Sequence, residues 1–345
     1  MHALLDRALA AARQLRASDV HLKAGLAPVL RIDGDLRTLS DVPPLSREFL
    51  QSLAFSMLND RRREILDRTG DVALSLVAPD GSRQRVQVSQ HRGGTTIAVR
   101  LVPAQAPTLE KLGLPPEIGA LVEPGAGLVL VAGPAGAGKT TTLAALANQI
   151  NGARACHIVS IEDPVEIALG DRRSVVVQRE VGLDAPSAAA ALRAALRQDV
   201  DVLVVGEPRD EEAIDLAVHA AETGRLVLAG VGAADVGAAA ERWVELAGAE
   251  RPSLRGRLAR ALRGVVAQRL VKRPDGRGRG AAVDLLLVDD GVRSHLTSTA
   301  PWLSDAPALR EAVVHVAPQP DARAAGRGRT SEPEQDSVED EAHPD

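Results

Sequence analysis

The clearest chemistry in this sequence lies in eight consecutive residues with the spacing G-x-x-x-x-G-K-T. They are Gly133, Pro134, Ala135, Gly136, Ala137, Gly138, Lys139 and Thr140. Glycines let backbone N–H groups converge on a phosphate, Lys139 can reach the β- and γ-phosphates, and the Thr140 hydroxyl can hold Mg²⁺. An apolar run at 128–132 precedes the loop, and helix-forming residues follow from Thr141. A glycine-rich turn can also end a strand for structural reasons alone, but this context favours an ATP site. Residues 133–141 are the predicted nucleotide-binding residues, and Thr140 is a predicted Mg²⁺ ligand.

Three carboxylates follow a second apolar run. Residues 158–161 lead directly into Glu162, Asp163 and Glu166. Carboxylates this close repel one another unless a cation or hydrogen-bond donors neutralise them. The pattern therefore indicates a metal-binding or water-activating role, with a solvated acidic loop as the alternative.

Glu207 follows a third apolar run, 202–205, after a single glycine. Parallel strands bring their carboxyl ends to one edge of a sheet, where nucleotide sites lie. A carboxylate that a buried strand delivers there can orient the attacking water or hold Mg²⁺. The arrangement resembles a Walker B element, and Glu207 is therefore a predicted catalytic and metal-binding residue.

Composition and charge argue against a nucleic-acid partner. Aromatic residues make up only 1% of the 345 residues, which leaves few rings on which bases could stack. The net charge of −5 belongs to residues 318–345, which hold eight acidic residues and three arginines. Removing that segment leaves 38 basic and 38 acidic residues, so the overall balance implies no basic face.

The compartment predicted from the sequence is the cytoplasm. Cys156 is the only cysteine, so no disulfide can form within the chain. The first residues lack the apolar core of a signal peptide, and no window approaches 18 uninterrupted apolar residues. Peripheral association with the inner membrane stays open.

Two patterns of hydrophobicity divide the chain. Over residues 1–103, a helix, a hairpin, a second helix at 45–68 and a three-stranded meander predict a small α+β domain. Residues 104–124 are rich in Pro and Gly and are interpreted as a linker.

From residue 125 to 317, short apolar runs alternate with helices and predict a mostly parallel sheet covered on both faces. The runs lie at 128–132, 158–161, 175–177, 202–205, 226–229 and 283–288. Residues 318–345 carry almost no apolar side chains and are expected to be disordered.

Taken in order, these motifs resemble the type IV pilus retraction ATPases (PilT-like) within the type II/IV secretion ATPases. The matching stretches are 17–22, 34–37, the phosphate loop, 161–166, 178–182, 191–199, 202–210 and 221–224. The resemblance covers residues 18 to about 296, far more than any single motif.

The resemblance implies a PAS-like N-terminal domain joined to a RecA-like P-loop ATPase domain, assembled as a homohexamer with ATP between subunits. It implies that Glu166 and Glu207 serve the attacking water and Mg²⁺. It also implies that arginines of the meander reach the nucleotide, with Arg92 and Arg100 as the best matches by position and Arg85 behind them. The alternative for each arginine is a solvated strand residue. The implied partner is an inner-membrane pilus or secretion platform protein, with or without a second full motor ATPase.

Two departures from the family pattern qualify this reading. Arg225 and Gly232 stand where the family has the two histidines of its His box, so imidazole donors to the γ-phosphate are missing. The family's signature near the C-terminus is eroded at residues 291–296. In the family, that segment is associated with pilus retraction.

Two functions of different classes follow. The first is a motor subunit that hydrolyses ATP, slowly if the missing donor matters, and powers pilus or secretion dynamics. The second is a nucleotide-binding regulatory or structural relative with little turnover. A nucleic-acid translocase is a distant third, opposed by the neutral folded region and the few aromatic residues.

Overall fold

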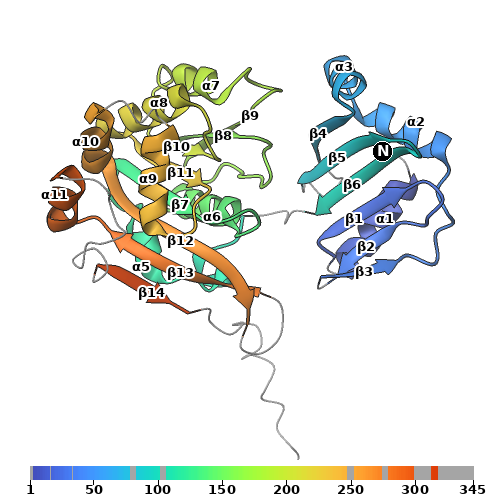
Figure 1. The fold of residues 1–345 in the computed structure, drawn as a ribbon, viewed down its shortest axis with the longest axis horizontal. Coiled ribbons are helices and arrows are strands. Elements are labelled where there is room, and N and C mark those ends of the chain that lie inside the picture. The colour runs from blue at the N-terminus through green and yellow to red at the C-terminus, as the bar shows by residue number, and fades with distance from the viewer. Residues whose placement is uncertain are drawn as a thin grey trace, which may run out of the picture.

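The computed structural model describes residues 3–15, 17–32, 34–77, 83–101, 106–246, 252–273, 279–298 and 312–317. These residues form two separate β-sheets, each with its own helices (Figure 1). Among the described helices, none is both long and apolar enough to cross a membrane. The tail at 318–345, predicted to be disordered, lies outside the described residues.

The first sheet is antiparallel and has the order β3-β2-β1-β6-β5-β4. Its elements are α1 (Ala3–Gln14), β1 (Asp19–Lys23), β2 (Val29–Ile32), β3 (Asp35–Thr38), α2 (Arg47–Met57), α3 (Asp60–Thr69), β4 (Asp71–Val77), β5 (Arg83–His91) and β6 (Gly94–Leu101). Alternate residues of the strands pack against all three helices in one apolar core. Polar side chains occupy the other face, as expected for an antiparallel sheet covered on one side.

The helix predicted over 45–68 is two helices. Leu58 is extended and ends α2, and Asn59 begins α3 by accepting a hydrogen bond from the Arg62 backbone N–H at 3.0 Å. An Asn side chain in this position satisfies an N–H that a helix start leaves without a partner. The hydrophobic period alone does not reveal such a cap.

The second sheet has the order β14-β13-β12-β7-β11-β10-β8-β9. The strands from β12 to β9 pair in parallel, β13 pairs antiparallel with β12, and β14 pairs antiparallel with β13. Its strands are β7 (Gly127–Ala132), β8 (His157–Glu162), β9 (Val175–Glu180), β10 (Val202–Val205), β11 (Leu226–Val231), β12 (Leu262–Lys272), β13 (Arg279–Leu287) and β14 (Val313–Val316). The six predicted apolar runs all lie in strands, apart from Val288, which follows the end of β13. β12 and β14 were not predicted, and β9 is an edge strand rather than a buried one, since Val175 is 62% exposed.

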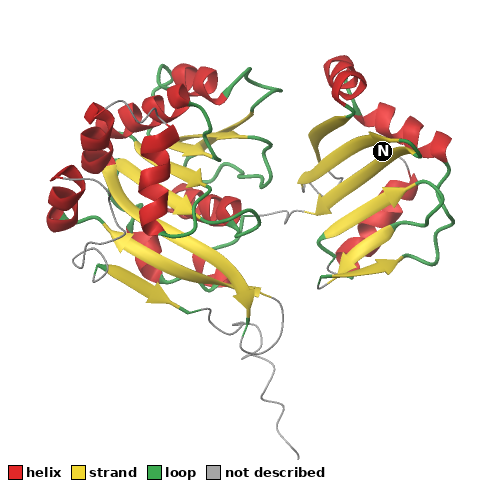
Figure 2. Ribbon diagram, in the orientation of Figure 1, coloured by secondary structure: helices red, strands yellow, loops and turns green. Residues whose placement is uncertain are grey.

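Helices cover both faces of this sheet (Figure 2). One face carries α7 (Ala188–Ala195), α8 (Glu211–Glu222), α9 (Val236–Leu246), α10 (Pro252–Ala261) and α11 (Asp290–Ser298). The other carries α4 (Leu109–Leu112), α5 (Pro116–Ala120) and α6 (Lys139–Ala153). α4 and α5 belong to the range predicted as a linker, yet Leu109 and Ile118 are buried against the second sheet.

Gly230, near the end of β11, leaves no room for a side chain. A Cβ atom there would lie 2.0 Å from the carbonyl oxygen of Gly206, just after the last ladder pair between Val205 and Ala229. We therefore expect Gly230→Ala to push β10 and β11 apart and to lower the free energy of unfolding by about 1–3 kcal/mol. Urea unfolding of both variants measures this. Gly170→Ala is the control, because nothing lies within 4 Å of that Cβ position; an equal cost for the two would contradict the expectation.

Candidate nucleotide site

The phosphate loop connects β7 to α6, as predicted. Gly138 precedes the helix with φ 92°, a conformation that favours glycine, and no side chain caps the helix start there. The first N–H groups of this 15-residue helix therefore keep their capacity to bind an anion, and the helix dipole adds to it. The loop tip at Pro134, Ala135 and Gly136 is exposed.

Lys139 lies over the loop and contacts the strand-end carboxylate. Its Nζ donates to the carbonyl oxygens of Gly133 at 2.9 Å and Pro134 at 3.3 Å. The same Nζ lies 3.6 Å from Oε2 of Glu207. β7 and β10 are separated in the sheet only by β11, and their carboxyl ends bring the two charges together. The structure thus joins the phosphate loop to one of the two predicted catalytic carboxylates.

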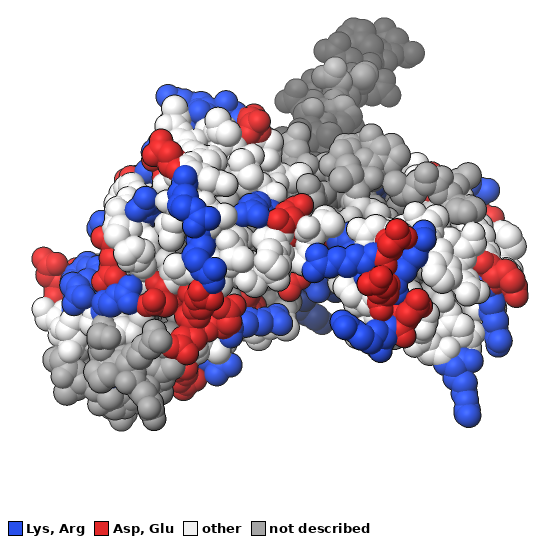
Figure 3. Space-filling model, turned by 90° about the horizontal axis from the view of Figure 1, so that it is seen from above, with Lys and Arg blue, Asp and Glu red and all other residues white. Residues whose placement is uncertain are grey.

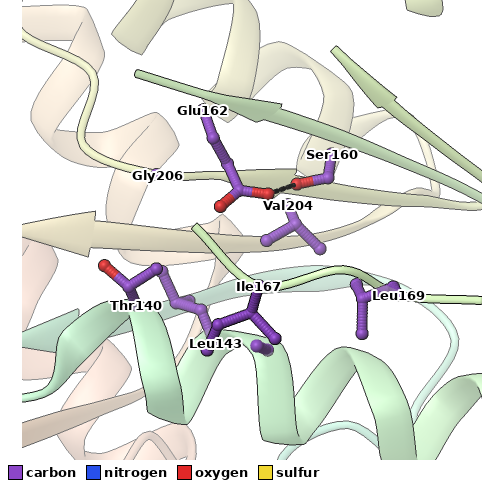
Figure 4. A pocket seen from close by; sticks show the side chains of 9 residues that line it. Thr140, Leu143, Ser160, Glu162, Ile167, Leu169, Val204 and Gly206 are labelled. Atoms are coloured by element: carbon purple, nitrogen blue, oxygen red, sulfur yellow. Dashed lines mark hydrogen bonds between the residues drawn. The ribbon is translucent and has the colours of Figure 1, made fainter. Parts of the chain in front are cut away.

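Thr140 and Glu162 line a single small cavity at this edge of the sheet (Figure 4). The cavity has an accessible volume of about 10 Å³, room for about one water molecule. Ser160 and Gly206 line it as well, whereas Glu166 does not. Five of the nine lining residues are apolar, and Glu162 already accepts a hydrogen bond from Ser160, so this cavity is not built for a metal ion. The predicted Mg²⁺ ligands are Thr140, in the first turn of α6, and Glu207, beside Lys139. They carry the hydroxyl and carboxylate oxygens that Mg²⁺ prefers, so these two residues fit that ion. The sequence predicts Glu162 only as one of three clustered carboxylates, and the catalytic role falls to Glu166 and Glu207.

Glu162 is almost fully enclosed. Its side chain accepts hydrogen bonds from the Ser160 hydroxyl and, at 3.3 Å, from Nε2 of Gln178. Burial disfavours the charged form and raises the pKa of Glu162 above its ordinary 4.5, the two hydrogen bonds oppose that shift, and the nearby charge of Glu166 adds to it. The folded protein therefore holds this proton at a pH where the unfolded chain has released it.

This pKa shift has a testable consequence for stability. Because the folded state binds more protons than the unfolded state above pH 4.5, stability falls as pH rises through the raised pKa. Glu162→Gln keeps an acceptor oxygen for Ser160 and Gln178 without the charge. We expect the variant to have a higher Tm than the wild type at pH 8 and no advantage at pH 4, by thermal unfolding. Glu64→Gln, at an exposed carboxylate on α3, is the control; an equal gain at both pH values would mean that burial of the charge is not the cause.

Glu166 contacts an arginine of the first sheet. Its Oε1 lies 3.0 Å from an Nη atom of Arg85. Ser75 on the neighbouring strand donates to the carbonyl oxygen of Val165 at 3.2 Å. The acidic motif is therefore in contact with the N-terminal domain of its own chain.

Arg92 and Arg100 are the arginines ranked first from the sequence. Within one chain, however, Glu166 contacts Arg85 rather than either of them. Arg92 is exposed at the tip of the β5–β6 hairpin, seven residues or about 23 Å along the strand from Arg85. Arg100 is directly opposite Arg85 in the ladder, but its Nε donates to Asp19 at 3.0 Å. Like charges opposite one another are destabilising, and here each arginine has its own carboxylate.

The two altered His-box positions lie at opposite ends of one strand, β11. Arg225 immediately precedes β11 and Gly232 immediately follows it, so seven residue steps, about 23 Å, separate them. A Cβ atom at Gly232 would lie 3.1 Å from Oε1 of Glu207. Within one chain, only the second position faces the phosphate loop, and glycine leaves the space beside Glu207 without a side chain.

Comparison with known proteins gives a consistent result. A family model described as "Type II/IV secretion system protein" matches residues 1–300. The chain is 37% identical over 279 residues to the type IV pilus retraction ATPase PilT of Pseudomonas aeruginosa, covering 81% of this chain and 80% of the relative. It is 36% identical over 287 residues to a twitching motility protein of Neisseria gonorrhoeae, with 81% and 76% covered. A crystal structure of the pilus retraction motor PilT with bound ADP matches with a TM-score of 0.79 and 39% identity, over 86% of each chain.

Proposed function

Because this chain belongs to the type II/IV secretion system protein family, we propose that it is a motor subunit that hydrolyses ATP to power pilus or secretion dynamics. The observation that carries the proposal is the 3.6 Å contact between Lys139 Nζ and Glu207 Oε2. It places a strand-end carboxylate beside the phosphate loop, which is the arrangement that ATP hydrolysis needs. The relative named as a retraction ATPase and the motor solved with ADP support the same function.

In the proposed reaction, the loop amides and Lys139 bind the phosphate oxygens and offset their charge. Bound Mg²⁺ would supply Lewis-acid chemistry at the γ-phosphate, held by Thr140 and, through water, by Glu207. Glu207 also orients the attacking water and accepts its proton. Glu166 remains a proposed second carboxylate for this task, which requires that Arg85 release it or move with it.

The arginines support a proposed assembly. Arg92 is exposed at the tip of its hairpin and Arg100 is paired with Asp19, so in this proposal the nucleotide that they contact belongs to a neighbouring subunit. We propose a homohexamer with ATP between subunits, in the cytoplasm against an inner-membrane platform protein. In this proposal the domain at 1–103 moves relative to 125–317. The packing of α4 and α5 limits the hinge to the chain before Leu109.

A second candidate is a nucleotide-binding regulatory or structural member of the family with little turnover. Gly232 favours it, because no donor stands beside Glu207 at that position. The mixed surface charge favours neither candidate: Figure 3 shows basic and acidic side chains interspersed over the face in view.

Two measurements on the purified full chain distinguish the candidates. Titration with ADP tests binding, and steady-state phosphate release from ATP tests hydrolysis. The motor function predicts binding together with phosphate release that EDTA abolishes. Binding without release above the buffer background would replace the motor by the second candidate, and absence of binding would remove both.

A further inference from the structure

Gln268 is a buried polar residue on β12 that contacts the phosphate loop from behind. It is 3% exposed, and both ends of its carboxamide are hydrogen bonded. Nε2 donates to the carbonyl oxygen of Ala137 at 2.7 Å, within the loop. Oε1 accepts from the hydroxyl of Thr142, itself buried in the first turn of α6, at 2.8 Å. Because a buried amide is costly without partners, these two bonds hold the side chain in one orientation.

The main chain of β12 approaches the loop just as closely. A Cβ atom at Gly133 would lie 2.6 Å from the carbonyl oxygen of Gln268, and one at Gly138 would lie 3.1 Å from its Nε2. Contact with this strand therefore requires glycine at Gly133, whereas at Gly138 the φ of 92° is the stronger reason for glycine. The ladder pair between Ala267 and Ala132 keeps β12 in register with β7.

The hydrogen bond from Gln268 to the Ala137 carbonyl also fixes the orientation of the Gly138 N–H. A trans peptide unit is planar, so its carbonyl and its N–H point in opposite directions. When Gln268 holds the Ala137 carbonyl toward β12, the N–H of Gly138 in the same unit points away from β12. The loop is rich in glycine and would otherwise sample many conformations. An amide already oriented before the ligand arrives lowers the ordering cost of binding.

We infer that Gln268 is a positioning residue for nucleotide binding, which orients the Ala137–Gly138 amide and joins the loop to the first turn of α6 through Thr142. The inference rests on the proposed ATP-binding function. Gln268 acts through the loop and does not itself contact the phosphates.

Gln268→Met tests the inference, because methionine has similar length and volume but makes neither hydrogen bond. The matched control is Asn151→Leu on the same helix. Asn151 is equally buried, donates to Gly170 O at 2.7 Å and accepts from the Arg172 and Ser174 amides at 3.2 and 3.3 Å, at the far end of α6. Both variants should lower Tm. Only Gln268→Met should weaken ADP binding, by about tenfold, and speed amide exchange at residues 134–142 in the free protein.

The outcomes separate this inference from the proposed function. If the wild type does not bind ADP, the proposed function falls. If the wild type binds ADP and Gln268→Met binds as tightly as Asn151→Leu does, the positioning role is wrong. If Gln268→Met fails to fold, Thr142→Val provides the test instead. This variant leaves Oε1 of Gln268 without its hydrogen-bond donor. A smaller loss of ADP affinity supports the role, and wild-type affinity overturns it.

Discussion

Replacing Glu207 by glutamine should lower steady-state ATP hydrolysis by about 10²–10³-fold while ADP still binds. Glutamine keeps the size of the side chain but cannot accept the proton of the attacking water. It also ends the ion pair with Lys139, so the lysine charge remains for the phosphates. Phosphate release under saturating ATP, with ADP titration alongside, measures both parts of the expectation.

Stability should be nearly unaffected by this change. The Glu207 side chain is 37% exposed, and ion pairs this accessible contribute about 0–1 kcal/mol. Glu212→Gln is the control, since Glu212 on α8 forms an exposed ion pair with Arg193 on the preceding helix, α7. Equal turnover by the wild type and Glu207→Gln would remove Glu207 from the mechanism, whatever the control shows.

Restoring an imidazole beside Glu207 should speed hydrolysis. Gly232→His places its Cβ 3.1 Å from Oε1 of Glu207, the mobile end of a side chain that can shift by the few tenths of an ångström required. The ring would then add a donor at the edge where the phosphate loop and Glu207 meet. We expect at least about tenfold faster turnover, part of the 10²–10³ that one transition-state donor contributes.

Gly232→Leu is the matched control, because it adds similar bulk without a donor, and its turnover should not rise. The double variant Gly232→His with Glu207→Gln should lose the gain, because the histidine acts beside that carboxylate. If histidine and leucine give the same rate, the missing His-box donor does not limit this protein.

Local patterns predicted most of the elements. Alternating or unbroken apolar runs identified most strands of both sheets. β12 and β14 were missed, and three strands, β1 to β3, stand where one hairpin was predicted. The RecA-like α/β fold is confirmed by the match to the retraction motor. β12 escaped because α10 ends at Ala261 and the strand begins at Leu262, with no turn residue between them. It also carries Arg263, Gln268 and Arg269 among its apolar residues, which hides its burial in the sequence.

The contacts of the three arginines could not be predicted from the sequence. Arg85, Arg92 and Arg100 all lie in one meander, and nothing in their local sequence ranks them by distance to a motif some 70 residues later. The ladder and the docking of the two domains decided that Arg85 meets Glu166 and that Arg100 turns to Asp19. Whether Arg92 and Arg100 act on a neighbouring subunit stays a prediction.

The sequence by itself determined the phosphate loop, because its chemistry depends on eight consecutive residues and on the strand and helix that flank them. It also determined that Glu207 follows a buried strand and that Gly232 lacks a donor. Only the tertiary structure decided that Glu162 shares the cavity of Thr140, that Gln268 supports the loop and that Gly232 faces Glu207. These contacts join strands far apart in the chain, and their order and register are set by packing across the whole sheet rather than by any local pattern.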